Sequence, residues 1–493
     1  MSDNRDKDQA KLSRRDLLIG GGAALTTLAL GAGASGCSEP PDDLSLPPPD
    51  DSAAYVDFDA AAIADDEKRF PLAAQVGALA GSSGLLVGYC ADDSKLRLRV
   101  WREAEEPGKQ FLVDERSLSP VDGYVRETLR GLSPGHAYRA ALFAEEGGKL
   151  VARSPINHFR APYPPGYRPT LTIGATACTS MKRAPFPALS QLAVQDIDIF
   201  CHTGDMSYND GAKDREGYRE KWRRTLSQKG YRELLPVAPL YHTLDDHEVS
   251  DNSVLYKLPA EQRAIAREAL FEHVATPDLG DGRIWNSYRW GDTVEIFVLD
   301  CRSERDVASR ESDDPIYISK AQLEWFRAAI TASKCHFKLV LNSVPIIGFP
   351  DFWIFQDDRW QGYERQRQTV LDIVDSIDNV WFVSGDFHIG MVARVEREGP
   401  RRDLWEILAG PGGNDNQLWT SLEANPVLFK RGVPPEQFDF FSSKTAATTL
   451  TLDPRRNTVR VRFVGDDGEV RYDKALSQGR DPEDRAGDVL TSS

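Results

Sequence analysis

Acidic, thiol and phenol side chains follow several apolar segments of the chain, at the points where these segments end. Cys178 ends the first segment, Asp205 and Tyr208 follow the second, and Asp246 and Asp386 follow two later ones. If the segments are neighbouring strands, their ends meet at one edge of a sheet and bring these groups together. Anionic groups gathered in one place repel one another unless cations lie among them. The sequence therefore predicts a metal centre.

The types of these side chains indicate two different metals. A thiolate from Cys178 and a phenolate from Tyr208 suit iron, whereas the carboxylates suit a hard divalent ion such as calcium, magnesium or manganese. Two such metals can bind phosphoryl oxygens, generate hydroxide and stabilise an in-line displacement. His247 directly follows Asp246, where it can protonate the leaving oxygen or stabilise its charge.

Each motif has an ordinary structural explanation when it is taken alone. Gly and Asp are common turn formers, so Gly204-Asp205 and Gly385-Asp386 would usually be turns. A buried cysteine is usually a small apolar residue, and Asp245–Glu248 (DDHE) would usually be a solvated loop or the start of a helix. Only their order, with each motif at the end of a predicted strand, favours a metal centre.

The residues from 168 to 475 predict the scaffold that positions these motifs. Apolar β-rich segments that end in polar residues alternate with helical segments, and residues 321–330 and 367–377 show helical spacing of their apolar positions. Strand, polar turn and helix in repetition predict a layered α/β core with its chemistry at the strand ends. Alternating residues from about 446 to 470 predict the closing strands of the same domain.

Residues 68–163 predict a β-sandwich that precedes this domain. Short alternating runs are separated there by breaks rich in Gly, Pro, Asp and Glu. Leu132–Tyr138 (LSPGHAY) resembles the turn and tyrosine of a fibronectin-III-like module, and residues 161–165 (APYPP) predict a linker. We expect this module to have a structural or spacing role.

Residues 1–37 predict an export signal. A paired arginine in Ser13–Ile19 (SRRDLLI) leads into a short Gly/Ala/Leu-rich stretch, which is typical of twin-arginine export. The stretch ends at Cys37 in a string that resembles a lipoprotein box, and ordinary cleavage after a small residue is the alternative. Residues 38–67 predict a solvated spacer, and residues 476–493 a loose tail. We expect a periplasmic or cell-surface protein that contacts the membrane only through a lipid anchor at Cys37.

Composition excludes several classes of partner and site. The 493 residues include 60 Lys and Arg against 76 Asp and Glu, and the net charge of −16 would repel duplex nucleic acid. The 6 cysteines form no CxxC pair, which argues against a disulfide scaffold or a Cys-rich zinc site. With only 8 histidines, a metal site must use other ligand types as well. The oligomeric state is left open.

In combination, the motifs resemble the PhoD-type alkaline phosphatase and phosphodiesterase family of metallophosphoesterases. Further similar strings are Asp245–Asn252 (DDHEVSDN), Leu299–Arg302 (LDCR) and Asp358–Tyr363 (DRWQGY). The resemblance covers about residues 70–475. It implies a four-layer αββα catalytic domain preceded by a fibronectin-III-like β-sandwich domain, with a site for Fe³⁺ and Ca²⁺ or another hard divalent ion such as Mn²⁺ or Mg²⁺.

The resemblance also implies roles for individual residues. As metal ligands it gives Cys178, Asp205, Tyr208, Asp246, Asp386 and His388. The forms DDHE and GDFH distinguish this family from the purple acid phosphatases, which share the first motif and carry GNHE. Arg302 and Arg305 have two open explanations, because they can grip a phosphate or form structural ion pairs. Asn342 can complete a metal shell, although a strand-end cap is favoured for it.

The sequence thus predicts an exported metal-dependent phosphatase or phosphodiesterase with His247 as its catalytic acid. A phospholipase D-like or purple-acid-phosphatase-like hydrolase is the alternative within enzymes. A surface-tethered binding or adhesion protein with an idle hydrolase fold is the alternative outside them. Preference for monoesters or diesters is left open.

Overall fold

The computed structural model of the chain describes residues 45–49, 53–106, 108–250, 255–280, 282–350 and 357–478. The predicted export signal, the predicted anchor at Cys37 and most of the predicted tail therefore lie outside the described residues. Within the described ranges, no helix has both the length and the apolar character that crossing a membrane requires.

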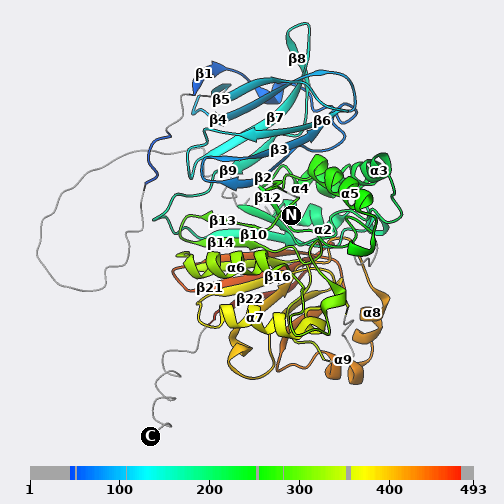
Figure 1. The fold of residues 1–493 in the computed structure, drawn as a ribbon. Helices are drawn as coiled ribbons and strands as arrows, with labels where there is room; N and C mark the ends of the chain where they lie inside the picture. Colours follow the sequence, from blue (N-terminus) through cyan, green and yellow to red (C-terminus); the bar gives the residue numbers. More distant parts are fainter. Residues whose placement is uncertain are drawn as a thin grey trace, which may run out of the picture.

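The N-terminal part of the fold consists of two packed layers of strands, drawn in blue and cyan in Figure 1. One layer, the N-terminal sheet, contains β1 (Ala54–Asp57), β5 (Lys109–Leu118), β4 (Lys95–Glu103), β7 (Ala137–Glu146) and β8 (Lys149–Arg153) in this order, and β9 (Asn157–Arg160) pairs with β7. Leu98 and Leu142 of this sheet pack against Val76 and Leu86 of the other layer. Near its edge, the Tyr138 hydroxyl accepts a hydrogen bond of 2.6 Å from a backbone N–H.

The second layer is part of a long sheet, the central sheet, that continues into the rest of the chain. Its strands, in order, are β22 (Val470–Leu476), β21 (Thr458–Gly465), β20 (Ala446–Asp453), β10 (Leu171–Thr176), β11 (Ile199–His202), β12 (Leu240–His242), β2 (Gln75–Ala80), β3 (Ser83–Tyr89) and β6 (Tyr124–Leu129). β10, β11 and β12 are parallel. The strands expected between residues 446 and 470 are present as β20 and β21.

The two parts of the central sheet meet at a single residue pair, Gly77 with Leu240. A side chain at Gly77 would approach the Leu240 and Ala275 carbonyl oxygens to 2.6 Å, so glycine permits the two backbones to lie this close. The sequence predicts a module at residues 68–163 joined by a linker; in the structure, strands of this module also extend the sheet that carries the predicted site.

A third sheet, the C-terminal sheet, packs face to face against the central sheet. Its strands, in order, are β13 (Asn286–Trp290), β14 (Val294–Val298), β15 (Phe337–Asn342), β16 (Val380–Ser384), β18 (Trp405–Leu408), β17 (Gly390–Arg394) and β19 (Phe438–Ser442). Ile173 and Ile199 of the central sheet share one buried core with Leu339 and Trp381 of the C-terminal sheet. Strands buried on both faces explain the continuous apolar runs in the sequence.

Helices cover the outer faces of both sheets. The central sheet is covered by α2 (Pro187–Ala193), α3 (Arg215–Leu226), α4 (Lys229–Leu234) and α5 (Ala260–His273), and the C-terminal sheet by α6 (Lys320–Ala332) and α7 (Glu364–Val374). Both helices expected from apolar spacing are therefore present, and the mixed α/β fold is confirmed. Two further short helices, α8 (Gln417–Glu423) and α9 (Pro426–Gly432), lie far from the N-terminal sheet (Figure 1).

The predicted spacer at residues 38–67 contains a strand that the sequence does not reveal. β1 pairs antiparallel with β5, and Phe58 behind it lies edge-on to the Trp101 and Phe143 rings, at centroid distances of 6.1 and 5.6 Å. The strand has only four residues, too few for apolar periodicity to be recognised. An aromatic anchor therefore orders a segment whose composition resembles that of a linker.

Glu406 on β18 makes the stability of this fold depend on pH. Its fully buried carboxylate accepts hydrogen bonds from the backbone N–H groups of Ile346 (3.0 Å) and Ile347 (2.7 Å) and contacts the Ser384 hydroxyl. Burial raises the pKa of Glu406 from 4.5 to about 7, although these hydrogen bonds oppose the shift. Because the folded state holds the proton more tightly, stability falls as pH rises from about 4.5 to 7.

We therefore expect Glu406→Gln, which cannot ionise, to flatten this pH dependence. Gln leaves one of the two backbone N–H groups without an acceptor, which costs about 1–3 kcal/mol at every pH, but its stability relative to the wild type should rise by on the order of 3 kcal/mol between pH 4.5 and 8. Urea unfolding midpoints between pH 4.5 and 8 measure this. Glu469→Gln, at an exposed position between β21 and β22, is the control and should leave the pH dependence of the wild type. Parallel pH profiles for wild type and Glu406→Gln would contradict the assignment.

Candidate metal centre

The ends of parallel strands from two sheets gather the predicted ligands at one place. Cys178 follows β10, Asp205 follows β11 and Asp246 follows β12 in the central sheet, while Asp386 and His388 follow β16 in the C-terminal sheet. Thr203 N–H donates to the Thr176 carbonyl and Cys178 N–H donates to the Gly204 carbonyl (3.1 Å), so backbone hydrogen bonds tie the loops together. The arrangement agrees with a site at the carboxyl ends of the strands.

Three overlapping groups of side chains are close enough to share cations. The groups are Cys178, Asp205 and His388; Asp205, Asp246 and His247; and Asp245, Asp246 and Asp386, and within each group one ligand atom per residue lies within 4.8 Å of the others. Asp205 belongs to two groups and Asp246 to two, so the three positions adjoin one another. Asp245 was not assigned a role from the sequence.

Several of these residues have a left-handed backbone conformation, which residues other than glycine rarely adopt. Positive φ angles occur at Cys178 (58°), Asp205 (57°), Asp386 (66°) and His388 (56°). A left-handed conformation at a residue with a side chain is held only when the surrounding structure determines it, and such residues cluster at functional sites. Gly204 has a φ of 100°, and a side chain there would come within 2.5 Å of the Asp245 Cβ.

Tyr208 connects the members of the first group through its hydroxyl. The hydroxyl donates to Asp205 Oδ2 (3.1 Å), lies 3.2 Å from His388 Nε2, and accepts from Asn414 Nδ2 (2.8 Å). Burial, followed by the charge of Asp205, raises the pKa of Tyr208 and of Cys178 well above their ordinary values. Burial also lowers the pKa of His388 to about 4, with smaller contributions from His247 and Arg359.

The residues present fit a metal centre. Thiol, phenol, imidazole and carboxyl groups together match iron beside a hard divalent ion. The pKa of Asp205 is raised well above its ordinary value, mainly by burial, with further contributions from neighbouring carboxylates. Asp245 Oδ2 is buried and has no hydrogen-bond partner among the described residues. A cation would reverse the pKa shifts of the anionic ligands and satisfy such an oxygen.

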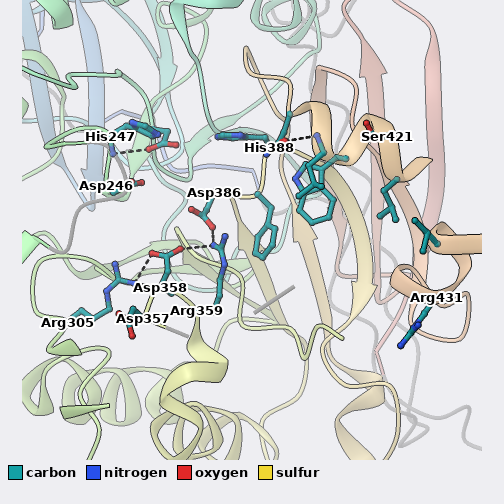
Figure 2. Close-up of a pocket in the computed structure, with 17 residues that line it drawn as sticks. Asp246, His247, Arg305, Asp357, Asp358, Arg359, Asp386, His388, Ser421 and Arg431 are labelled. Atoms are coloured by element: carbon teal, nitrogen blue, oxygen red, sulfur yellow. Dashed lines mark hydrogen bonds and ion pairs between the residues drawn. The ribbon is translucent and has the colours of Figure 1, made fainter. Parts of the chain in front are cut away.

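His247 lies beside these groups with its ring held on two sides. Its Nδ1 is 2.8 Å from Asp210 Oδ1, its backbone N–H donates to Asp205 (3.3 Å), and its ring contacts the Tyr208 ring in a tilted arrangement at a centroid distance of 4.0 Å. Burial of the imidazole lowers its pKa, but Asp205, Asp210 and Asp246 outweigh this effect and raise the pKa to about 10. His247 lines the cavity that Figure 2 shows.

Glu248 positions the site without belonging to the ligand groups. Its carboxylate accepts hydrogen bonds from the backbone N–H groups of Met206 (2.6 Å) and Asp245 (3.0 Å), so it joins the loop after β11 to the loop after β12. The residue is fully buried. The sequence showed this glutamate only as the last residue of DDHE. It did not indicate that the side chain would be buried, and the bridging role could therefore not be predicted.

Arg302 and Arg305 lie in different surroundings. Arg302 is buried; its guanidinium bonds Asp245 and Asp358, lies 3.0 Å from Asp386 and 3.6 Å from Asp246, and does not line the cavity. Arg305 lines the cavity and donates to the Asp358 carbonyl (2.7 Å). The sequence left open whether these arginines grip a phosphate or form structural ion pairs. The contacts of Arg302 are ion pairs.

Sequence reasoning gave no role to Arg359, which also lines the cavity. It pairs with Asp386 and, at 3.2 Å, with Asp358, and its guanidinium lies 3.8 Å from the Phe387 ring centroid (Figure 2). Arg302, Arg359 and Arg305 hold the pKa of Asp358 well below its ordinary value against the opposing effect of burial. The motif DRWQGY contains this arginine, but the spacing gave no indication that it would reach Asp386.

Asn342 and the cysteines outside the site have structural surroundings. Asn342 Oδ1 accepts from Cys301 Sγ (2.7 Å) and from the Trp360 indole N–H (3.3 Å), which favours the strand-end role over a place among the ligands. Cys201 and Cys301 are free, buried thiols.

The site opens into two cavities. The larger, of about 1020 Å³, is lined by Asp205, Asp246, His247, Asp386 and His388 on one side and by residues of α8 and α9 on another. The smaller, of about 650 Å³, also reaches His247 and His388 and is lined by Lys182, Lys221 and Arg224. A phosphate ester of moderate size can therefore approach the predicted ligands.

Comparisons with known proteins show which family and which solved structures this chain resembles. Residues 173–444, more than half of the chain, match the family model of the PhoD-like phosphatases. Alkaline phosphatase D of Bacillus subtilis (strain 168) is 24% identical in an alignment that covers 60% of this chain and 60% of that relative's length. A solved structure of PhoD superposes with a TM-score of 0.68 at 17% identity, over 83% of this chain and 89% of the other.

A purple acid phosphatase from yellow lupin (Lupinus luteus) seeds superposes with a TM-score of 0.58 at 14% identity, over 86% of this chain and 76% of the other. These two structural likenesses show a shared fold. The family resemblance that the motifs indicated is confirmed by the family model.

Arg302 supplies positive charge to buried carboxylates, and its removal should destabilise the fold. We expect Arg302→Met to lower the free energy of unfolding by about 3 kcal/mol or more, because Asp245 would lose its buried partner and Asp386 would keep only Arg359. Denaturant unfolding of the purified variants measures this. Arg365→Met, which removes an exposed pair with Asp313, is the control and should cost less than about 1 kcal/mol. Equal losses in the two variants would contradict this role of Arg302.

Proposed function

The chain belongs to the PhoD-like phosphatase family, and we propose that it is a metal-dependent phosphoric ester hydrolase whose reaction takes place at the centre described above. The observation that carries the proposal is the position of Asp205. This carboxylate belongs both to the group with Cys178 and His388 and to the group with Asp246 and His247. A carboxylate shared between adjacent cation positions suits two-metal phosphoester hydrolysis.

The ligand roles are part of the proposal. We assign Cys178, Tyr208 and His388 to Fe³⁺, and Asp246 and Asp386 to Ca²⁺ or another hard divalent ion such as Mn²⁺ or Mg²⁺, with Asp205 between them. When bound, these metals would supply Lewis-acid polarisation of the phosphoryl group and a nucleophile from water. Positive φ angles at Cys178, Asp205, Asp386 and His388 fix the directions in which their side chains leave the backbone.

His247 is the proposed general acid. Asp210 contacts its Nδ1 and the Tyr208 ring packs against it at a tilt, so the imidazole is held in one orientation. We propose that the proton for the leaving oxygen is carried at Nε2, the other ring nitrogen. Arg305, which lines the cavity, is the remaining candidate for a phosphate contact, and Arg302 acts through the carboxylates that it neutralises.

The N-terminal features complete the proposal. Twin-arginine export with a lipid anchor at Cys37, and hence a periplasmic or cell-surface location, rest on the sequence motifs. A fibronectin-III-like N-terminal module is supported by the hydrogen bond from the Ser133 N–H to the Tyr138 hydroxyl, since a tyrosine that bonds backbone a few residues upstream is typical of such sandwiches.

Metal content and turnover together test this function. Protein lacking residues 1–37, purified without chelator, should contain iron, show a visible thiolate- or phenolate-to-iron band, and hydrolyse aryl phosphate esters faster with added calcium. The band should vanish in Cys178→Ala if the thiolate gives rise to it and in Tyr208→Phe if the phenolate does, and Cys178→Ala should lose more activity than the roughly 10- to 100-fold typical of an outer-shell partner. Cys335→Ala removes a buried free thiol outside the groups and is the matched control. Protein that stays inert after reconstitution with iron and calcium would refute the function.

A further inference from the structure

One wall of the larger cavity is apolar, although it faces the carboxylates and histidines of the metal centre. We call it the α8–α9 wall; it consists of Leu418, Trp419 and Leu422 of α8 and Leu428 of α9. Trp419 and Leu422 are buried, whereas Leu418 is 57% exposed and Leu428 is 52% exposed. Two large aliphatic side chains are thus presented to the space above the site.

The chemistry proposed for the centre does not require this wall. A phosphate group is bound by cations, by Arg and Lys, or by N–H groups, and none of these interactions involves a leucine. Exposed apolar side chains that adjoin a polar site are typical of a surface that contacts the rest of the ligand. The wall is continuous with the centre through Phe387, which neighbours Asp386 in the chain and packs against Trp419 at a centroid distance of 5.7 Å.

Charge fixes where the phosphate of such a ligand would lie. Arg305 and Arg359 line the cavity on the side of the carboxylates, and Arg431 stands near the end of α9 (Figure 2). Both arginines are paired with Asp358 or Asp386, so the cations of the proposed function supply the charge that directs the phosphate to this side, and the part of the ligand that extends along the cavity meets the leucines. The smaller cavity, which adjoins the same two histidines, is lined by charged residues instead, with Lys182, Lys221 and Arg224 beside Asp210 and Asp415. The two exits thus differ in character.

We propose that the α8–α9 wall is a binding subsite for an apolar ester group, so that the substrates are phosphate esters carrying an alkyl or aryl chain. This inference rests on the proposed function and names the substrate class that the same site selects. Phosphate occupies the metal centre, its apolar substituent lies against Leu418 and Leu428, and any second substituent leaves toward the lysines of the smaller cavity.

Chain-length dependence of binding tests the subsite independently of turnover. Methylphosphonate and octylphosphonate both carry the anionic group but cannot be hydrolysed at the carbon–phosphorus bond. Each methylene transferred from water to an apolar surface is worth up to about fourfold in affinity. Burial of about three methylenes of the octyl chain against the α8–α9 wall therefore corresponds to roughly 50-fold. Calorimetric titration of the metal-reconstituted protein should therefore show octylphosphonate binding about 50-fold more tightly than methylphosphonate.

The variant that removes the subsite is Leu418→Gln combined with Leu428→Gln, which should reduce this ratio to less than about fivefold. Both side chains are half exposed, so the substitution leaves the core packed. Val427→Gln is the matched control, because Val427 lies on the same helix and is 79% exposed but does not line the cavity. It should keep the ratio of the wild type.

The outcomes separate this inference from the proposed function. Absence of hydrolysis of every aryl ester tested refutes the function, whereas the titrations report on the subsite in either case. Equal affinity for the two phosphonates, or binding of neither, would overturn the subsite. Loss of the ratio in Val427→Gln as well would show that the exposed face of α9 acts as a whole, as in contact with a lipid surface, and would also overturn it. A preserved ratio in the control and a collapsed ratio in the double variant support it.

Discussion

Burial of several carboxylates within a few ångströms of one another is the constraint on which the site depends. Asp205, Asp245, Asp246 and Asp386 are all largely removed from water, and burial raises the pKa of Asp205 and Asp245. Such a cluster is stable only when positive charge is interleaved with it. Part of that charge is built into the chain, since the buried Arg302 pairs with three of the four. The remainder is what a bound cation would supply.

The backbone maintains this cluster because the proposed ligands directly follow strand ends. β10 and β11 are buried between the helical layer and the C-terminal sheet, and β16 is likewise buried on both faces, so the carboxyl ends of these strands cannot shift without disturbing the shared core. That rigidity explains how four site residues persist at positive φ. Glu248 extends the same control to the loop after β12. The packing that stabilises the sheets therefore also fixes the geometry of the site.

The local pattern of apolar and polar residues predicted the positions of the strands and of the motifs at their ends. Apolar runs located the strands that carry Cys178, Asp205 and Asp386, since a strand buried on both faces has few polar residues until it ends. Pairings between distant segments were not predictable in this way. Arg359 reaches Asp386, and Gly77 meets Leu240, only because the fold brings separate segments together. Neither contact has a spacing signature, and β1 was too short to have one.

One side of the larger cavity is formed by residues at strand ends and another by the short helices α8 and α9, and this difference has a physical consequence. Metal ligands need angular precision, which strand ends buried between packed sheets provide, whereas an apolar contact is non-directional and scales with area. α8 and α9 are short helices at the periphery, held to the core chiefly through Trp419, Leu422 and partly buried aromatic neighbours. Substitutions on their exposed positions can change what the wall contacts without passing strain to Asp386 or His388. Selectivity at the proposed ester subsite can therefore vary while the proposed catalytic centre remains fixed.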